Sequence, residues 1–264
     1  MITLNDDIVK IDSFPDGTIL MKCPKVPFAK IRWTYENDRE FLALIYLVKH
    51  LHSNGYSEIA LHMPYIPNAR QDRVKSQWDI FTLKYFAELL NSLKLDYVRV
   101  LDPHSSVSEA LINNLTIETP ERYINKVVDK IMDYRDTNEA PLMFYPDEGA
   151  MKRYSDKTKL PYTFGIKKRN WETGKIEGLH IAGNVEQIAG KDILIVDDIC
   201  SRGGTFYHSA KKLKEHGAND IYLYVSHCEN TILEGDLLKG DLIKKVYTTD
   251  SIFTKSHEKI EVLK

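Results

Sequence analysis

The chain has 264 residues, of which 43% are hydrophobic and 28% are charged, the composition of an ordinary globular protein with one large domain or two of moderate size. Its 36 Lys and Arg residues are balanced by 38 Asp and Glu residues, which leaves a formal net charge of −2. Because this charge offers no positive field to displace counterions, we do not expect binding to nucleic acid or to an anionic membrane surface.

Strand and helix patterns alternate in the first half of the chain. Residues 37–51 and residues 79–94 repeat apolar side chains at helical spacing, and Gly55 follows the first of them as a helix stop. Residues 58–63 and residues 97–101 have the short apolar patterns of strands. The two helices are therefore expected to connect strands of one sheet.

The second half of the chain has the same order. Residues 142–145, 193–196 and 221–225 are uninterrupted apolar runs, which is typical of parallel strands that are buried on both faces. Between the last two, residues 205–216 have a helical pattern, and Gly217 follows as a C-cap. This order predicts an α/β fold in which each sheet is mostly parallel and is flanked by helices.

The polar stretch of residues 118–139 shows no clear strand pattern, so it is the predicted seam between two domains. We place the first domain at residues 1–122 and the second at residues 123–264. The last residues of the chain are expected to pack on the first domain. No internal sequence repeat relates the two halves residue by residue.

Targeting and cross-linking signals are absent from the sequence pattern. No apolar run approaches the roughly 18 residues that span a bilayer, and the first residues lack the basic and apolar regions of a secretory signal. The three cysteines, Cys23, Cys200 and Cys228, are too few and too scattered for a disulfide framework or a zinc site. We therefore expect a reduced, cytoplasmic protein with no membrane partner.

The strongest chemical signal follows the strand pattern of residues 193–196. Asp197 and Asp198 stand at its carboxyl end, where open α/β sheets bind their ligands. Adjacent carboxylates are costly to bury, so they are expected to face solvent, a metal ion or the hydroxyl groups of a sugar. A glycine pair then leads into a helix, and its backbone N–H groups can cradle a phosphate. The cradle is formed by Ser201, Arg202, Gly203, Gly204 and Thr205.

A simpler interpretation is that the acidic pair only caps the helix and that the glycines only turn the chain. However, residues 196–205 resemble the phosphoribosyl diphosphate (PRPP) binding motif of type I phosphoribosyltransferases. Further segments narrow the resemblance to the ribose-phosphate diphosphokinase (PRPP synthetase) family, and they occur in that family's order. These segments are residues 14–17 (FPDG), 64–73 (PYIPNARQDR), 102–104 (DPH), 146–149 (PDEG) and 166–169 (IKKR). The resemblance covers nearly the whole chain and implies two tandem phosphoribosyltransferase-like domains.

The resemblance implies an ATP site in the first domain. Arg70 and Gln71 would contact ATP, because a planar guanidinium stacks on adenine or forks onto phosphate oxygens. Phe14 would cover the adenine from a neighbouring subunit, and Asp16 would read the edge of the base. The implied assembly is a homo-oligomer with a nucleotide site shared between subunits. Considered alone, Phe14 and Asp16 belong to a simple turn, and Arg70 belongs to a surface loop.

The resemblance also implies Mg²⁺ as a cofactor and a lid over the triphosphate. His104 and Asp147, each just after a predicted strand, would hold the ion, with His104 also serving ATP, although Mg²⁺ prefers oxygen ligands. Lys168 and Arg169 would be the catalytic residues of a mobile lid at residues 165–178, which closes when substrate is bound. A solvated run of charge is the alternative interpretation of that segment.

The implied reaction is a diphosphate transfer. The C1 hydroxyl of ribose 5-phosphate attacks the β-phosphorus of ATP, which gives phosphoribosyl diphosphate and AMP. Arg202 replaces a small hydroxyl residue of the family motif, so ADP-ribose, with a second phosphate, is an alternative acceptor. Two rival functions are those of a phosphoribosyltransferase and of a non-catalytic regulatory subunit of PRPP synthetase. The first would not need Arg70 and Gln71, and the second would be expected to lose Lys168 or the acidic pair.

Overall fold

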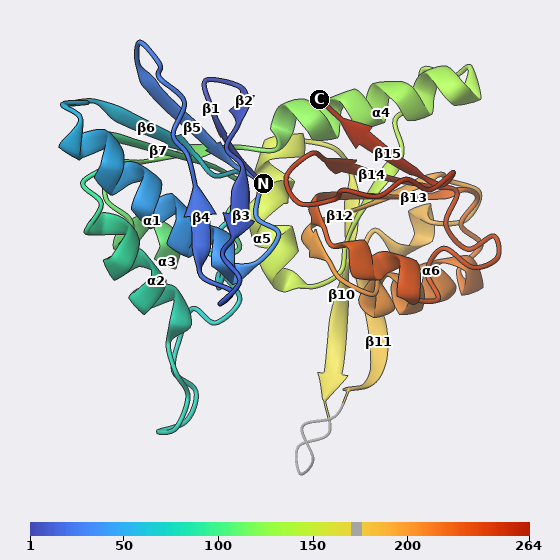
Figure 1. The fold of residues 1–264 in the computed structure, drawn as a ribbon. Coiled ribbons are helices and arrows are strands. Elements are labelled where there is room, and N and C mark those ends of the chain that lie inside the picture. The colour runs from blue at the N-terminus through green and yellow to red at the C-terminus, as the bar shows by residue number, and fades with distance from the viewer. Residues whose placement is uncertain (170–175) are drawn as a thin grey trace. The chain divides into compact units, whose positions relative to one another are not determined.

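The computed structural model describes residues 1–169 and 176–264, and it describes side chains outside residues 167–179. The chain forms two compact units, unit 1 at Met1–Thr119 and unit 2 at Pro120–Lys264. Each unit is built on a mostly parallel sheet with helices packed against it (Figure 1). The predicted α/β fold with two such sheets is therefore confirmed. The division falls directly before helix α4 (Glu121–Arg135), whereas the sequence analysis places it between residues 122 and 123, inside that helix.

Unit 1 contains a six-stranded sheet and a separate two-stranded hairpin. Its strands are β1 (Ile2–Leu4), β2 (Asp7–Ile8), β3 (Ile11–Ser13), β4 (Ile19–Met21), β5 (Ala29–Trp33), β6 (Ile59–His62), β7 (Tyr97–Leu101) and β8 (Leu115–Glu118). Its helices are α1 (Asp38–Ser53), α2 (Thr82–Asn91) and α3 (Val107–Leu111). The sheet order is β2-β1-β5-β6-β7-β8, and β5 to β8 are parallel to one another. The hairpin pairs β3 with β4.

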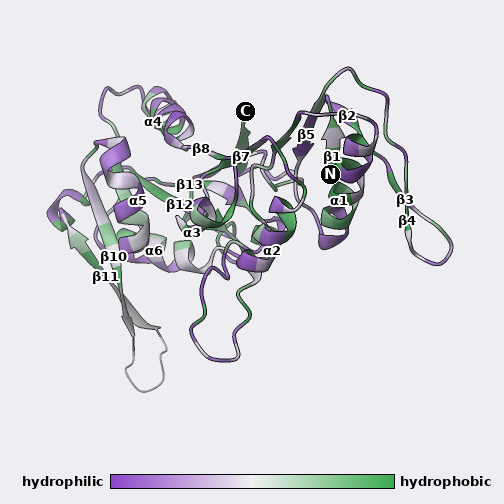
Figure 2. Ribbon diagram, turned by 90° about the vertical axis from the view of Figure 1, so that its left-hand side faces the viewer, coloured by the Kyte–Doolittle hydropathy of each residue, from purple (hydrophilic) through white to green (hydrophobic). Residues whose placement is uncertain are grey.

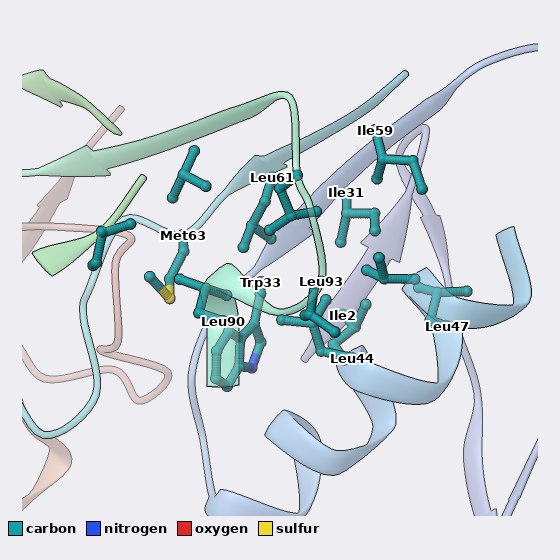
Figure 3. Packing of buried hydrophobic residues seen from close by; sticks show 14 of the residues in the cluster. Ile2, Ile31, Trp33, Leu44, Leu47, Ile59, Leu61, Met63, Leu90 and Leu93 are labelled. Carbon is teal, nitrogen blue, oxygen red and sulfur yellow. The ribbon is translucent and has the colours of Figure 1, made fainter. Parts of the chain in front are cut away.

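The amphipathic pattern of α1 explains how it covers this sheet. Green and purple residues alternate along α1 in Figure 2, as a helix with one buried face requires. Leu44 and Leu47 lie on the buried face, and Figure 3 shows them near Ile31 of β5. The Trp33 indole stacks on Phe41 of α1 with 5.7 Å between ring centroids. Each fully buried side chain of this size contributes about 2 kcal/mol, so the helix holds β5 and its neighbours firmly.

Unit 2 contains a seven-stranded sheet. Its strands are β9 (Leu142–Tyr145), β10 (Tyr162–Arg169), β11 (Ile176–Gly183), β12 (Ile193–Cys200), β13 (Ile221–Cys228), β14 (Lys245–Thr249) and β15 (Ile260–Leu263). Its helices are α4, α5 (Glu148–Thr158) and α6 (Gly204–Glu215), with 3₁₀ turns η1 (Val185–Gln187) and η2 (Asn230–Glu234). The order is β11-β10-β9-β12-β13-β14-β15, and only the β10–β11 pair is antiparallel. Within the described ranges, no helix has the length and apolar character to cross a bilayer.

Three elements differ from the sequence predictions. The polar stretch predicted as a seam contains α4, which buries one apolar face although its overall composition is polar; the face consists of Tyr123, Ile124, Val127, Val128 and Ile131. Strand β12 continues past residue 196 to Cys200, because its ladder with β13 extends that far. The last residues of the chain form β15, which pairs with β14, so they belong to the sheet of unit 2.

The sheet of unit 2 brings two distant cysteines together. Cys200 of β12 and Cys228 of β13 are register partners, and both are buried with free thiols. The hydrogen bond with Cys228, followed by burial, raises the pKa of the Cys200 thiol well above its ordinary value. Cys23 lies in unit 1 and is partly exposed, also as a free thiol. The two thiols of unit 2 are therefore part of the core, where thiols are inert.

Candidate active site

The sequence analysis places the acidic pair after the strand, but in the structure both residues lie inside β12. Asp197 is the register partner of Val225 in β13, and the ladder continues to Cys200. Burial alternates along this part of the strand: Asp197 is partly exposed, whereas Asp198 is 4% exposed. The backbone N–H of Asp198 donates a 2.9 Å hydrogen bond to Oδ1 of Asp197, and a side-chain hydrogen bond between the two residues is among the causes that raise the pKa of Asp197, so the two carboxylates lie close together. Asp197 is the more accessible of the two.

Asp198 is neutralised by a cation that sequence reasoning missed. The Arg153 guanidinium of α5 lies 3.3 Å from Oδ1 of Asp198, and both side chains are largely shielded from solvent. A buried carboxylate without a counter-charge is strongly destabilising, so the pair holds α5 against β12. The only signal in the sequence is that an aspartate within an apolar strand requires a positive partner. It does not indicate which of the 36 basic residues supplies it.

Asp197 lies in a concentration of negative charge. Its pKa is raised well above the ordinary value, chiefly by burial, then by the charge of Asp198, and in smaller part by Asp147. Asp147 is the N-cap of α5, and its Oδ1 accepts a hydrogen bond of 3.1 Å from the backbone N–H of Ala150. Hydroxyl donors or a cation placed beside Asp197 would stabilise its ionised form. The acidic pair is thus prepared for a ligand of either kind.

The turn after β12 has the backbone geometry of an anion cradle. Gly203 has a φ of +77°, which is the left-handed region that favours glycine, and it is the N-cap of α6. The backbone N–H of Tyr207 donates to the Gly203 carbonyl at 2.9 Å, which closes the first helical turn. Gly204 and Thr205 are exposed at the helix start. Since the first N–H groups of a helix have no partner within it and the helix dipole is positive there, this turn favours an anion.

Two loop residues differ in how they face solvent. Ser201 is partly exposed. The Arg202 side chain is 72% exposed, and its guanidinium lies 3.0 Å from a carboxylate oxygen of Glu234. A pair this exposed contributes little to stability. Arg202 is thus a surface cation beside the cradle, held by a weak contact.

In unit 1, a buried carboxylate links two of the predicted site segments. Arg70 is exposed in the segment after β6, close in sequence to Asp72, which is 5% exposed. Asp72 accepts two hydrogen bonds from the guanidinium of Arg73, at 2.7 and 2.8 Å. These bonds, with a smaller contribution from the charge of His104, lower the pKa of Asp72 to about 2. The structure therefore brings the segment of residues 64–73 close to the segment after β7 that contains His104. The connecting residue is Asp72, to which the sequence analysis gave no role.

Gln71 is held by the start of α2. Its side-chain oxygen accepts a 3.0 Å hydrogen bond from the Thr82 hydroxyl, and its backbone carbonyl accepts one of 3.4 Å from Leu83. Gln71 is exposed, as is the neighbouring Arg70. The strand end, the turn and the first helical turn thus present both side chains to solvent.

The hairpin of β3 and β4 presents the remaining predicted nucleotide residues. Phe14 is 49% exposed, and its N–H donates to the Thr18 carbonyl at 3.0 Å. The Asp16 carboxylate accepts hydrogen bonds from the N–H of Thr18 at 3.0 Å and from its hydroxyl at 2.7 Å. The hydroxyl bond is the main reason that the pKa of Asp16 is lowered. Asp16 is therefore already engaged within its own turn.

The predicted metal and lid residues are described only in part. His104 belongs to unit 1 and Asp147 to unit 2, so the metal site expected from this pair stays a prediction. In the part of the chain that the structure describes, no group of three or more His, Cys, Asp or Glu side chains is arranged to hold a metal ion. The backbone of Lys168 and Arg169 ends β10, and their side chains lie outside the described residues, as do residues 170–175 of the predicted lid at residues 165–178.

Comparison with solved structures defines the class of fold. The structure is similar to the crystal structure of phosphoribosylpyrophosphate synthetase from Mycobacterium smegmatis, with a TM-score of 0.79 and 19% sequence identity. The match covers 97% of this chain and 85% of the other. The chain thus has the tandem type I phosphoribosyltransferase fold that its motifs indicate. A scan against family models finds no match.

Sequence relatives define the family within that class. The ribose-phosphate pyrophosphokinase of Pyrococcus furiosus is 30% identical over 230 residues, which are 83% of this chain and 77% of the relative. That of Sulfurisphaera tokodaii is 25% identical over 248 residues, which are 90% of this chain and 82% of the relative. The chain belongs to the ribose-phosphate pyrophosphokinase family. The predictions of this family and of an enzyme of this class are therefore confirmed.

Proposed function

We propose that the chain transfers diphosphate from ATP to the C1 hydroxyl of ribose 5-phosphate, which gives phosphoribosyl diphosphate and AMP. The observation that carries the proposal is the pairing of two features in unit 2. A partly exposed Asp197 lies near the end of β12, and Gly203, with a left-handed backbone, follows that strand and opens α6. A carboxylate suited to hydroxyl groups thus precedes a backbone cradle suited to a phosphate.

On the sugar side, the proposed roles follow from exposure and charge. The backbone of the Ser201–Thr205 loop and the start of α6 bind the 5-phosphate. Asp197 accepts hydrogen bonds from the ribose hydroxyls, which stabilise its ionised form. Asp198, buried against Arg153, completes the acidic pair and fixes the end of β12. The sugar is thereby oriented by groups that are already in place, which is how phosphoryl-type transfer is mainly accelerated.

On the nucleotide side, the proposed residues are long or aromatic side chains of unit 1. Arg70 and Gln71 bind ATP from the segment that Asp72 holds, and His104 binds it from the neighbouring segment. Phe14 and Asp16 serve the adenine of a neighbouring subunit in a homo-oligomer. The half-exposed ring of Phe14 at the tip of a hairpin supports this role, since it offers an apolar face that its own unit does not cover.

The carboxylates of unit 2 fit a Mg²⁺ ion. Asp147 lies close enough to Asp197 for its charge to raise the pKa of that carboxyl, and a divalent cation relieves such repulsion. Mg²⁺ is commonly held by one or two carboxylates together with substrate phosphates, which requires no larger protein cage. We assign Asp147, with His104, to the ion. When bound, Mg²⁺ supplies charge neutralisation of the phosphates.

We assign the remaining charge stabilisation to Lys168 and Arg169. Their family motif supports this role, and cations that meet the transferring group are a recurrent requirement of phosphoryl transfer. In this proposal they exclude water and neutralise charge only when substrate is bound.

The exposure of Arg202 favours one second candidate, ADP-ribose as the acceptor. The Arg202 guanidinium lies outside the glycine cradle and is 72% exposed, so it can meet a second phosphate that the cradle does not hold. Ribose 5-phosphate remains the first choice, because the backbone N–H groups at the start of α6 suit the one phosphate that this sugar carries.

The test is AMP release from ATP and Mg²⁺ with either ribose 5-phosphate or ADP-ribose. We expect AMP with ribose 5-phosphate and little with ADP-ribose. AMP with ADP-ribose alone would move the proposal to the second acceptor. No AMP with either compound would reject the transfer and favour a regulatory subunit, and diphosphate release from phosphoribosyl diphosphate plus a nucleobase would favour a phosphoribosyltransferase.

A further inference from the structure

Residues 230–238, which we call the supporting segment, pack against the phosphate loop of unit 2. The segment consists of η2 and the turn that follows it. Gly235 lies against the backbone of Arg202, and Leu237 lies against Gly203. Neither Gly235 nor Leu237 belongs to the motifs that identified the site. The loop therefore has a second wall besides α6, supplied by a part of the chain that follows the next strand.

Residue 235 must be glycine because there is no room for a Cβ atom, and not because of its backbone conformation. Its φ of −87° and ψ of −179° are extended values that any residue adopts. A Cβ built at this position, however, would overlap the carbonyl oxygen of Arg202, and it would lie 2.9 Å from the carbonyl carbon. The glycine thus lets the backbone at residue 235 lie closer to the Arg202 carbonyl than a side chain would allow. Only glycine permits this contact without movement of the segment or of the loop.

The second contact is equally close. A Cβ built at Gly203 would lie 2.8 Å from Cδ2 and 2.9 Å from Cβ of Leu237. Leu237 is fully buried, so its side chain has no free space into which to retreat. Gly203 therefore needs to be glycine for two reasons, its left-handed φ and this wall.

The supporting segment is itself firmly anchored. The N–H of Glu229, just before it, donates to the Cys200 carbonyl at 2.8 Å. The Asn230 amide exchanges two hydrogen bonds with Thr254, at 2.9 and 3.1 Å. Ile232 is fully buried in the core of unit 2. Because the segment is fixed at these points, it is expected to set the position of the loop, and not the reverse.

We propose that Gly235 is a positioning residue for sugar-phosphate binding: its close contact with the Arg202 carbonyl sets the backbone of the phosphate loop so that the N–H groups of Gly203, Gly204 and Thr205 converge on one phosphate. The inference rests on the proposed function in one respect, that this loop binds a sugar phosphate. Gly235 does not touch the ligand and acts only through the loop.

The test compares Gly235→Ala with a matched control, Gly240→Ala. Gly240 has a φ of +67° and open space around its Cα, so alanine there strains the backbone without meeting the loop. Binding of ribose 5-phosphate is measured by calorimetry in the absence of ATP, with the melting temperature recorded for each protein. We expect Gly235→Ala to raise the Kd at least tenfold and to raise KM for the sugar more than it lowers kcat, whereas Gly240→Ala keeps the parental Kd.

A parental Kd in folded Gly235→Ala would overturn the proposal. Should that variant fail to fold, Leu237→Val withdraws the other contact of the supporting segment with the loop by one methylene. It tests whether the segment positions the loop at all: we expect the Kd to rise a few-fold, and a parental Kd would overturn the proposal. A parent protein that binds no ribose 5-phosphate would count against the proposed function instead. In that case the crystal structure of Gly235→Ala decides the inference: displacement of the Arg202 carbonyl supports it, and an unmoved loop with a shifted residue 235 rejects it.

Discussion

The two predicted binding regions, one in each unit, are built from different parts of the chain: backbone groups in unit 2 and side chains in unit 1. In unit 2, the predicted phosphate cradle is made of backbone: a left-handed Gly203, the start of α6 and the end of β12. In unit 1, the predicted nucleotide residues Arg70 and Gln71 are exposed side chains on a segment after a strand. The first arrangement is set by packing and leaves little freedom, whereas the second needs only a few anchoring bonds. Substitutions at the unit 2 site should therefore affect stability as well as activity, whereas substitutions of the exposed side chains Arg70 and Gln71 in unit 1 should mainly change affinity.

The largest expected effect is on the stability of unit 2. Arg153→Met leaves Asp198 buried without its cation, which should lower the free energy of unfolding by about 3 kcal/mol. Denaturant titration measures the change. Lys152→Met is the matched control on the same helix, because the Lys152 side chain is 73% exposed and its ammonium lies 3.9 Å from the exposed carboxylate of Glu148. Equal losses in the two variants would show that the ion pair with Asp198 does not account for the loss.

The next effect separates activity from stability. Asp197→Asn should lower kcat/KM for the sugar about 100-fold, which corresponds to about 2.7 kcal/mol of lost transition-state stabilisation. Its melting temperature should not fall, since burial and the charge of Asp198 already raise the pKa of Asp197 and disfavour its ionised form. AMP release and thermal melting test the two parts. A variant that is less stable but fully active would assign Asp197 to the core and remove it from the site.

A smaller effect is expected in unit 1. Arg70→Ala should raise KM for ATP about tenfold, or about 1.4 kcal/mol, while kcat and the melting temperature stay near the parental values, since the side chain is exposed. Lys75→Ala removes another exposed cation close by in the sequence and is the control. It should leave KM for ATP, kcat and the melting temperature unchanged. If both variants weaken ATP binding alike, the segment attracts the nucleotide by charge alone and not by a defined contact.

The smallest effect is the acid dependence of unit 1. The folded pKa of Asp72 is about 2, below its ordinary value of 3.8, so its ionised form stabilises the fold above about pH 4 and this contribution is lost as pH falls toward 2. Asp72→Asn should therefore be less stable than the parent by about 1 kcal/mol near neutral pH, a figure reduced for the 64% exposure of Arg73. Urea titrations at several pH values measure the gap, which should narrow only below pH 4. A gap that is unchanged in acid, or one shared by the exposed control Asp241→Asn, would contradict this assignment.

The sequence predicts those parts of the molecule that depend on local patterns. The strand at residues 97–101 is predicted to the residue, and the glycine turn into α6 is placed correctly, because apolar period and left-handed backbone are local properties. Helix α4 is missed because its polar face dominates its composition, although five of its side chains are buried. Arg153 and Gly235 are missed for another reason. Each matters through a partner distant in sequence, Asp198 or Arg202, and only the folded sheet brings them together.

The burial of the two thiols of unit 2 has a practical consequence for labelling. Cys200 and Cys228 are fully covered, whereas Cys23 in unit 1 is partly exposed. A maleimide or similar alkylating reagent should therefore modify the native chain at a single position without any prior cysteine replacement. Burial raises the pKa of the Cys23 thiol as well, so the modification should proceed faster in mildly alkaline buffer. A fluorophore attached in this way would report on unit 1 and would leave the side chains of unit 2 chemically unmodified.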